Sequence, residues 1–197
     1  MTRGGLGLAV VLSLALLPAR GEESAPPVAG PRLHEAGAPP GRAGAPGESS
    51  CFECHNDLEL NEPEGRLEIL GLPRSWDAGA AYALTVILES EGMVRAGFQA
   101  GASAGALRPL DDGVSVVPDS LGRSYVGHAA GRTIPDSGER TRWIMEWLAP
   151  EAGEDTIRIS VAANSANGDN SPLGDFVYTA SAEIMPASLP VRSIKRP

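Results

Sequence analysis

The chain has 197 residues, of which 42% are hydrophobic, and carries a formal net charge of −9. This length is enough for one domain with a sizeable core. The excess of acidic residues argues against nucleic acid or an anionic membrane as a partner, because both are negatively charged. It favours a partner protein with a basic docking surface.

The N-terminus has the pattern of an export signal. A basic start at Arg3 precedes an apolar run over residues 6–17, and small residues follow at 18–21. The run is too short to span a membrane, so residues 1–21 are predicted to be a cleaved signal peptide. No later segment is long and apolar enough to cross a bilayer. We therefore expect a periplasmic or secreted protein without an integral membrane segment after signal removal.

Residues 22–49 are dominated by Pro, Gly, Ala, Glu and Arg. A segment with so few large apolar side chains cannot bury enough surface to offset the entropy of ordering. The composition predicts a disordered linker over 22–49, a single domain over 50–190 and a loose tail over 191–197.

The domain begins with Cys51-Phe52-Glu53-Cys54-His55, which has the C-x-x-C-H pattern of c-type haem attachment. In such a motif the two thiols add to the vinyl groups of haem, and the histidine binds the iron. Cys51 and Cys54 are the only cysteines of the chain. The motif therefore predicts one covalently bound haem c, with His55 as the proximal axial ligand.

Other uses of a C-x-x-C pair remain open. A disulfide would close a small loop, although the βαβ setting of a thioredoxin-like motif is not found here. A structural zinc site needs a fourth ligand, and the sequence has no second C-x-x-C and no H-x-x-x-H to supply it. The C-x-x-C-H can also be read as plain structural cysteines.

Beyond the motif, short apolar or alternating runs are separated by turn residues, with no sustained helical periodicity. The predicted strands lie around residues 67–72, 82–88, 95–100, 114–117, 142–148, 156–161, 175–179 and 182–185. About seven such strands are typical of an antiparallel, immunoglobulin-like β-sandwich. Trp143 and Trp147 lie four residues apart on one strand, so we expect both to pack in the core.

Several local motifs follow the C-x-x-C-H in a fixed order. They are Gly97-Phe98-Gln99, Ser124-Tyr125-Val126-Gly127-His128, Trp143-x-x-x-Trp147-Leu148-Ala149-Pro150, Ala163-Asn164-x-x-Asn167-Gly168-Asp169 and Gly174-Asp175-x-Val177-Tyr178-Thr179. In this order, over residues 47–185, the chain resembles the bacterial Reeler-like domains known as choice-of-anchor V proteins. The resemblance implies an exported Reeler-type β-sandwich with an N-terminal haem-type motif. Gly127 departs from the family pattern, which has a hydroxyl residue before the histidine.

The sixth position of the iron decides what a haem c can do. A second His or Met there is typical of an electron carrier, and an open position allows small-molecule binding or redox catalysis. The candidates are His34, Met93, Met145, Met185 and His128. We predict His128 as the distal axial ligand, because it lies between predicted strands where a loop can bring it over the haem, and it matches the histidine of the family. The alternative is a locally hydrogen-bonded histidine.

A polar cluster precedes the last long strand, and its members are Asn164, Asn167, Asp169, Asn170 and Asp175. Oxygen ligands of this kind can hold calcium, but the spacing is not that of an EF-hand loop. Turn chemistry explains the same residues, since Asn and Asp tolerate unusual backbone angles.

Two functions from different classes remain. The first is an exported mono-haem c-type cytochrome-like domain that acts in electron transfer or as a redox subunit. Such a domain carries electrons or binds a partner. We therefore favour this role over catalysis by the chain itself. The second is an extracellular adhesion or recognition module, in which the C-x-x-C-H is a metal or disulfide clasp. A fold of this class does not choose between them.

Overall fold

The computed structural model describes residues 1, 37–153 and 155–187, and the regular secondary structure of these residues is almost entirely β-strand. The predicted signal peptide over 1–21 lies outside the described residues apart from Met1, and so does the tail over 191–197. The strands are β1 (Gly65–Leu70), β2 (Ser75–Trp76), β3 (Ala81–Ser90), β4 (Arg95–Ala102), β5 (Ala106–Pro109), β6 (Val114–Val117), β7 (Ser124–His128), β8 (Arg140–Leu148), β9 (Ile157–Ala166) and β10 (Phe176–Pro186). A short 3-10 helix, η1 (Cys51–Glu53), precedes them.

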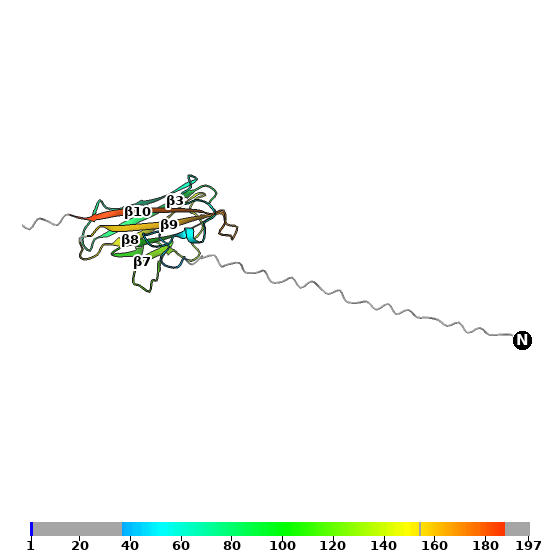
Figure 1. The fold of residues 1–197 in the computed structure, drawn as a ribbon, viewed down its shortest axis with the longest axis horizontal. Helices are drawn as coiled ribbons and strands as arrows, with labels where there is room; N and C mark the ends of the chain where they lie inside the picture. Colours follow the sequence, from blue (N-terminus) through cyan, green and yellow to red (C-terminus); the bar gives the residue numbers. More distant parts are fainter. Residues whose placement is uncertain (2–36, 154, 188–197) are drawn as a thin grey trace, which may run out of the picture. The chain divides into compact units, whose positions relative to one another are not determined.

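The strands form two sheets that pack face to face (Figure 1). One sheet has four strands in the order β1-β3-β8-β5, and the other has six in the order β2-β10-β9-β4-β7-β6. Neighbouring strands are antiparallel, except for the short parallel pairing of β2 with β10. This arrangement confirms the predicted antiparallel β-sandwich.

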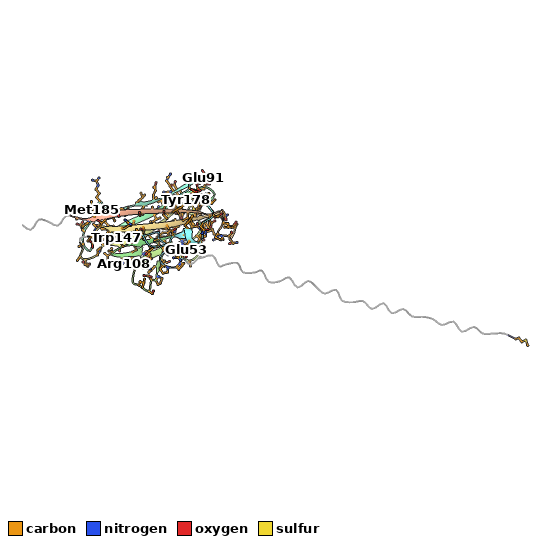
Figure 2. All side chains as sticks on the ribbon, viewed as in Figure 1. Glu53, Glu91, Arg108, Trp147, Tyr178 and Met185 are labelled. Atoms are coloured by element: carbon orange, nitrogen blue, oxygen red, sulfur yellow. The ribbon has the colours of Figure 1, made fainter. Side chains whose placement is uncertain are left out.

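The core lies between the two sheets and is built from alternate residues of each strand. Trp143, Met145 and Trp147 of β8 all belong to it, which confirms that the two tryptophans pack internally. Phe98 of β4 stacks on Trp143 with ring centroids 4.4 Å apart. Figure 2 shows Trp147 within the body of the domain. Stability therefore comes from the inner faces of the sheets.

The structure has more strands than the sequence predicts. The runs over 175–179 and 182–185 merge into β10, and three strands were not predicted, namely β2, β5 and β7. The unpredicted strands are short, with two to five residues, and β5 contains a proline and an arginine. One consequence concerns His128, which we expected in a loop. It is the last residue of β7.

The outer face of the six-stranded sheet is covered by residues 37–50, which we call the strap. Ala43 of the strap is fully buried and packs with Val117 and Tyr125 of the sheet. Gln99 of β4, also fully buried, donates from Nε2 to the carbonyl oxygens of Ala38 and Pro39, and its Oε1 accepts from the Arg42 N–H at 2.6 Å. One side-chain amide thus binds three backbone groups of the strap.

The prediction of a disordered linker over 22–49 is therefore wrong for residues 37–49. From its composition alone, this segment buries too little apolar surface to be ordered. Hydrogen bonds and contacts with the six-stranded sheet order residues 37–49 instead. Gly44 adopts a positive φ of 75° where the strap turns, a conformation that glycine reaches without strain. Residues 22–36 lie outside the described part of the chain.

We predict that Gln99→Met releases the strap while the sandwich stays folded. The substitution keeps the side-chain volume but leaves two carbonyls and one N–H of the strap without partners. We expect the free energy of unfolding in urea to fall by about 1–3 kcal/mol, and limited proteolysis to cut within 37–49. Thr85→Ala, on β3 in the other sheet, serves as a control that leaves the strap resistant. Unchanged resistance in Gln99→Met would show that Gln99 does not hold the strap.

Candidate functional site

The C-x-x-C-H follows the strap directly and forms one helical turn. Ser50 caps η1 by accepting from the Phe52 N–H, and the N–H groups of Cys54 and His55 donate to the Cys51 carbonyl at 3.2 and 3.1 Å. Residues three apart in a 3-10 turn lie one above the other, so Cys51 and Cys54 share one side of the turn. Both cysteines are free thiols. The turn thus presents two thiols side by side, followed at once by an imidazole.

His55 is oriented by a buried carboxylate. Its Nδ1 lies 2.7 Å from Oδ2 of Asp175, whose side chain is 1% exposed. Because a carboxylate oxygen accepts, Nδ1 donates to Asp175, and Nε2 is the ring nitrogen that Asp175 does not engage. A ring held in this way is typical of a histidine that binds a metal, since the carboxylate fixes both the tautomer and the orientation.

Asp175 is itself held by neighbours from β9 and the loop that follows it. The Asn167 N–H donates to Oδ1 at 3.0 Å, and the Asn164 amide donates to Oδ2 at 3.3 Å. These bonds satisfy the buried carboxylate, which would otherwise be costly to bury. Within the described part of the chain, Oδ1 of Asn164 is a buried oxygen that accepts no hydrogen bond. These residues therefore hold His55 through Asp175, and the Asn164 Oδ1 remains at the site as a hydrogen-bond acceptor.

His128 occupies the point where strands β4 and β7 separate. Their pairing ends at Gln99 and Gly127, and at the next position Nδ1 of His128 lies 3.2 Å from the Phe98 nitrogen and 3.4 Å from the Phe98 oxygen. The imidazole is 6% exposed. It fits because residue 97 is glycine: a Cβ there would lie 2.8 Å from Cε1 of the ring. The histidine is thus fixed at the end of a strand, which corrects the expected loop position.

One cavity brings these groups together. Its volume is about 270 Å³, and its lining includes Cys51, Cys54, His55, His128 and Asp175. Phe98, Ala96, Ala166 and Pro39 give it an apolar surface, and Arg42 and Arg95 add positive charge. The motif and His128 are 73 positions apart in the sequence, counted from residue 55 to residue 128. The fold therefore places the two predicted ligand histidines at the same cavity.

The other candidates for a sixth ligand are placed elsewhere or are not described. Met145 lies in the core. Met93 is 5% exposed and also belongs to the core. Met185 is 65% exposed near the end of β10, away from Glu53 (Figure 2). His34 lies outside the described residues.

The polar cluster over 164–175 serves turn formation. The side-chain oxygens of Asn167 and Asp169 accept from the N–H groups of Asp169 and Ser171, and Asp175 binds His55. These contacts favour the turn explanation over calcium binding. Within residues 37–153 and 155–187, no group of three or more His, Cys, Asp or Glu side chains is placed to hold a metal ion by itself.

Some residues of the site were not singled out from the sequence. Arg95 and Thr133 line the cavity, and Nη1 of Arg95 donates to the Thr133 hydroxyl at 2.9 Å. Gly97 and Gln99 appeared only as parts of a motif. Their alternation with Phe98 and Ala100 is the signal that places them on the outer face of β4. Asp175 appeared as a turn or calcium residue, and nothing in its spacing indicates His55 as its partner.

Comparison with known proteins finds solved structures that are similar to this chain in fold. No family model matches the chain, and no curated protein matches it. Among solved structures, the Reelin-N domain of F-spondin is 18% identical, with a TM-score of 0.47 over 70% of this chain and 97% of that one. The human F-spondin reeler domain is 17% identical, with a TM-score of 0.48 over 69% of this chain and 98% of that one. A cohesin module from Clostridium perfringens has 15% identity and a TM-score of 0.39 over 61% of this chain and 95% of that one.

At such identities the likeness concerns the fold alone. In the part of the chain that the structure describes, no helix is long and apolar enough to cross a membrane.

The two thiols should differ sharply in reactivity when no group is attached. Burial raises the pKa of the Cys51 thiol to about 12, whereas Cys54 is exposed. Since the thiolate is the nucleophile, a raised pKa makes Cys51 the slower thiol at pH 8. We expect iodoacetamide to modify Cys54 first in the folded, haem-free protein, with Cys51 reacting faster as the pH rises towards 12. Mass spectrometry of peptides measures this order. In urea both cysteines should react at similar rates, and equal rates in the folded protein would contradict the prediction.

We also predict that Gly97→Ala displaces the His128 ring. The added methyl meets Cε1 and Nδ1 at 2.8 and 3.0 Å, so the imidazole must move. Overpacking of this kind costs about 1–3 kcal/mol of stability. Chemical shifts of the His128 ring protons should change, while those of the His55 ring stay close to the original. An unchanged His128 spectrum would show that the close approach to Gly97 is absent in solution.

Proposed function

We propose that the chain is an exported mono-haem c-type domain that acts in electron transfer or as a redox subunit. The single observation that carries this proposal is the cavity itself. Cys51, Cys54 and His55 line it on one side, and His128 reaches it from the end of β7. The attachment motif and a second histidine are thus available to one bound group.

The residues present fit a haem group. Cys51 and Cys54 would carry the two thioether links, and His55 would bind the iron through Nε2, because its Nδ1 is engaged by Asp175. The lining is mostly apolar, as a porphyrin face requires. A cavity of about 270 Å³ lies just below the range of about 300–1,000 Å³ for enclosed ligand sites, so a haem held there would keep an exposed edge. Bound haem supplies one-electron chemistry at its iron.

We assign His128 as the distal axial ligand. The Phe98 N–H donates to its Nδ1 at 3.2 Å, which fixes the imidazole at the cavity. Ligation by two histidines gives a lower reduction potential than ligation by His and Met. Two histidines at the iron would leave no position open to a small molecule.

The charge of the chain supports a basic redox partner. The proposed signal contains two arginines and no acids, so the exported chain would carry −11, with 14 basic and 25 acidic residues. Two acids close to the motif are paired: Glu53 with Arg42 and Glu48 with Arg123. Asp57, Glu59, Glu62 and Glu64 follow η1 and provide further negative charge. Such charge steers a basic protein towards an exposed haem edge. The proposed location is the periplasm or the outside of the cell.

Covalent attachment is the first test. The protein, produced with its signal and with the cytochrome c maturation machinery, should be red and should stay red after denaturation. Its mass should exceed that of the polypeptide by roughly 616 Da, the mass of haem b. The variant Cys51→Ala/Cys54→Ala, exported in the same way, should lack this adduct. Colourless wild-type protein with two thiols or one disulfide would refute the haem proposal and favour an adhesion or recognition module.

The role of His128 is the second test. His128→Ala removes the proposed distal nitrogen, so a low-spin haem spectrum should become high-spin, as the Soret and visible bands report. His34→Ala is a matched control that should leave the spectrum low-spin. An unchanged spectrum in His128→Ala would remove this histidine from the iron while leaving covalent attachment intact.

A further inference from the structure

The partner of the proposed proximal ligand is a buried carboxylate. Oδ2 of Asp175 lies 2.7 Å from Nδ1 of His55, and the Asp175 side chain is almost fully buried. The Asn164 amide and the Asn167 N–H donate to the same carboxylate, and neither of these donors is a cation. An ionised carboxylate has only acceptor oxygens, which matches the three donors around Asp175. His55 therefore meets a negative charge that solvent and salt screen very little.

The position of this charge matters for a group bound at His55. A hydrogen bond from Nδ1 to a carboxylate makes the ring more basic, so Nε2 becomes a stronger electron donor to a metal. The negative charge of Asp175 also disfavours the addition of an electron nearby, because charges interact strongly where water is excluded. Both effects act in the same direction and favour the oxidised state of an iron at Nε2.

The acids on the surface near the motif differ from Asp175 in their exposure. Glu59 is exposed, and Glu53 is exposed and paired with Arg42 at 3.0 Å. Water and salt screen exposed charges over about 10 Å at 0.1 M ionic strength. Asp175 combines burial with direct contact to the proposed iron ligand, so its charge acts on the site more strongly than theirs.

We propose that Asp175 is a positioning residue that lowers the reduction potential of the haem and makes the domain a low-potential electron carrier. This inference rests on the proposed function, because it concerns the same His55. In one cycle a donor protein loses one electron to the domain, and an acceptor protein then takes that electron. A carrier of low potential accepts an electron only from a strong reductant. The donor is therefore a strongly reducing redox protein.

The test is a redox titration of the covalently loaded protein, followed by absorbance. Asp175→Asn keeps the shape of the side chain and an oxygen that can accept from His55, but it removes the charge. We expect this variant to be about tenfold easier to reduce, which is a rise of about 59 mV for one electron. Asp175→Glu keeps the charge and changes the shape, so its potential should stay closer to that of the wild type. A low-spin spectrum in both variants shows that the iron ligands are retained.

Glu59→Gln is the matched control, because it removes the same charge from an exposed position near the motif. Its potential should move much less than that of Asp175→Asn, and added salt should reduce the difference further. Asn164→Leu is a second variant, which keeps Asp175 but removes one donor from Oδ2. Because the carboxylate then shares less of its charge with other donors, the potential should fall below that of the wild type.

The outcomes separate this proposal from the one on which it rests. Equal shifts in Asp175→Asn and Glu59→Gln, or an equal rise in Asp175→Asn and Asp175→Glu, would overturn the role of the Asp175 charge while the haem proposal stands. If Asp175→Asn does not take up haem, a rise instead of a fall in Asn164→Leu has the same effect. Colourless exported wild-type protein would overturn the proposed function itself, and this inference with it.

Discussion

The site depends on the hydrogen bonds of Gln99, which hold the strap on the outer face of the six-stranded sheet. In a two-sheet sandwich the outer faces usually meet solvent. Here the outward positions of β4 are Gly97, Gln99 and Gly101, so the centre of the sheet has two small residues around one long side chain. The close approach of Ala43 to Gly101 shows that the strap uses this space, since a Cβ at Gly101 would lie 3.3 Å from the Ala43 methyl. With the strap bound, Cys51 begins at a fixed point on the sheet.

A second constraint acts on the other side of the motif. Asp175, just before β10, holds His55, and residues 164 and 167 of β9 and its loop hold Asp175. The five-residue motif is therefore fixed before its first residue by β4 and at its last residue by the junction of β9 and β10. A site held in this way is formed before any ligand arrives, which lowers the entropy that binding must overcome. Burying the Asp175 carboxylate costs free energy, and its three hydrogen-bond donors offset that cost.

Sequence reasoning reached those parts that depend on local pattern. The alternating and apolar runs predicted the sandwich, because a strand buried on one face has a period of two. The residues of the five-residue motif Cys51, Cys54 and His55 line the cavity, and Trp143 and Trp147 were correctly assigned to the core. The strap was missed because its order depends on a side chain 57 to 61 positions away, and composition does not reveal such a contact. The partnership of His55 with Asp175 spans 120 positions and was missed for the same reason.

The separation of core and site also explains why the fold says little about function. On β4, Ala100 belongs to the core, Gln99 binds the strap and Gly97 lines the cavity, whereas Phe98 serves both core and cavity. One strand thus contributes residues both to stability and to the site. A β-sandwich can keep the first set and change the second without altering its architecture, which is how one fold comes to host unrelated functions. The specific features of this chain are the residues on the outer face: a glycine that makes room for His128, a glutamine that binds the strap, and an arginine at the cavity.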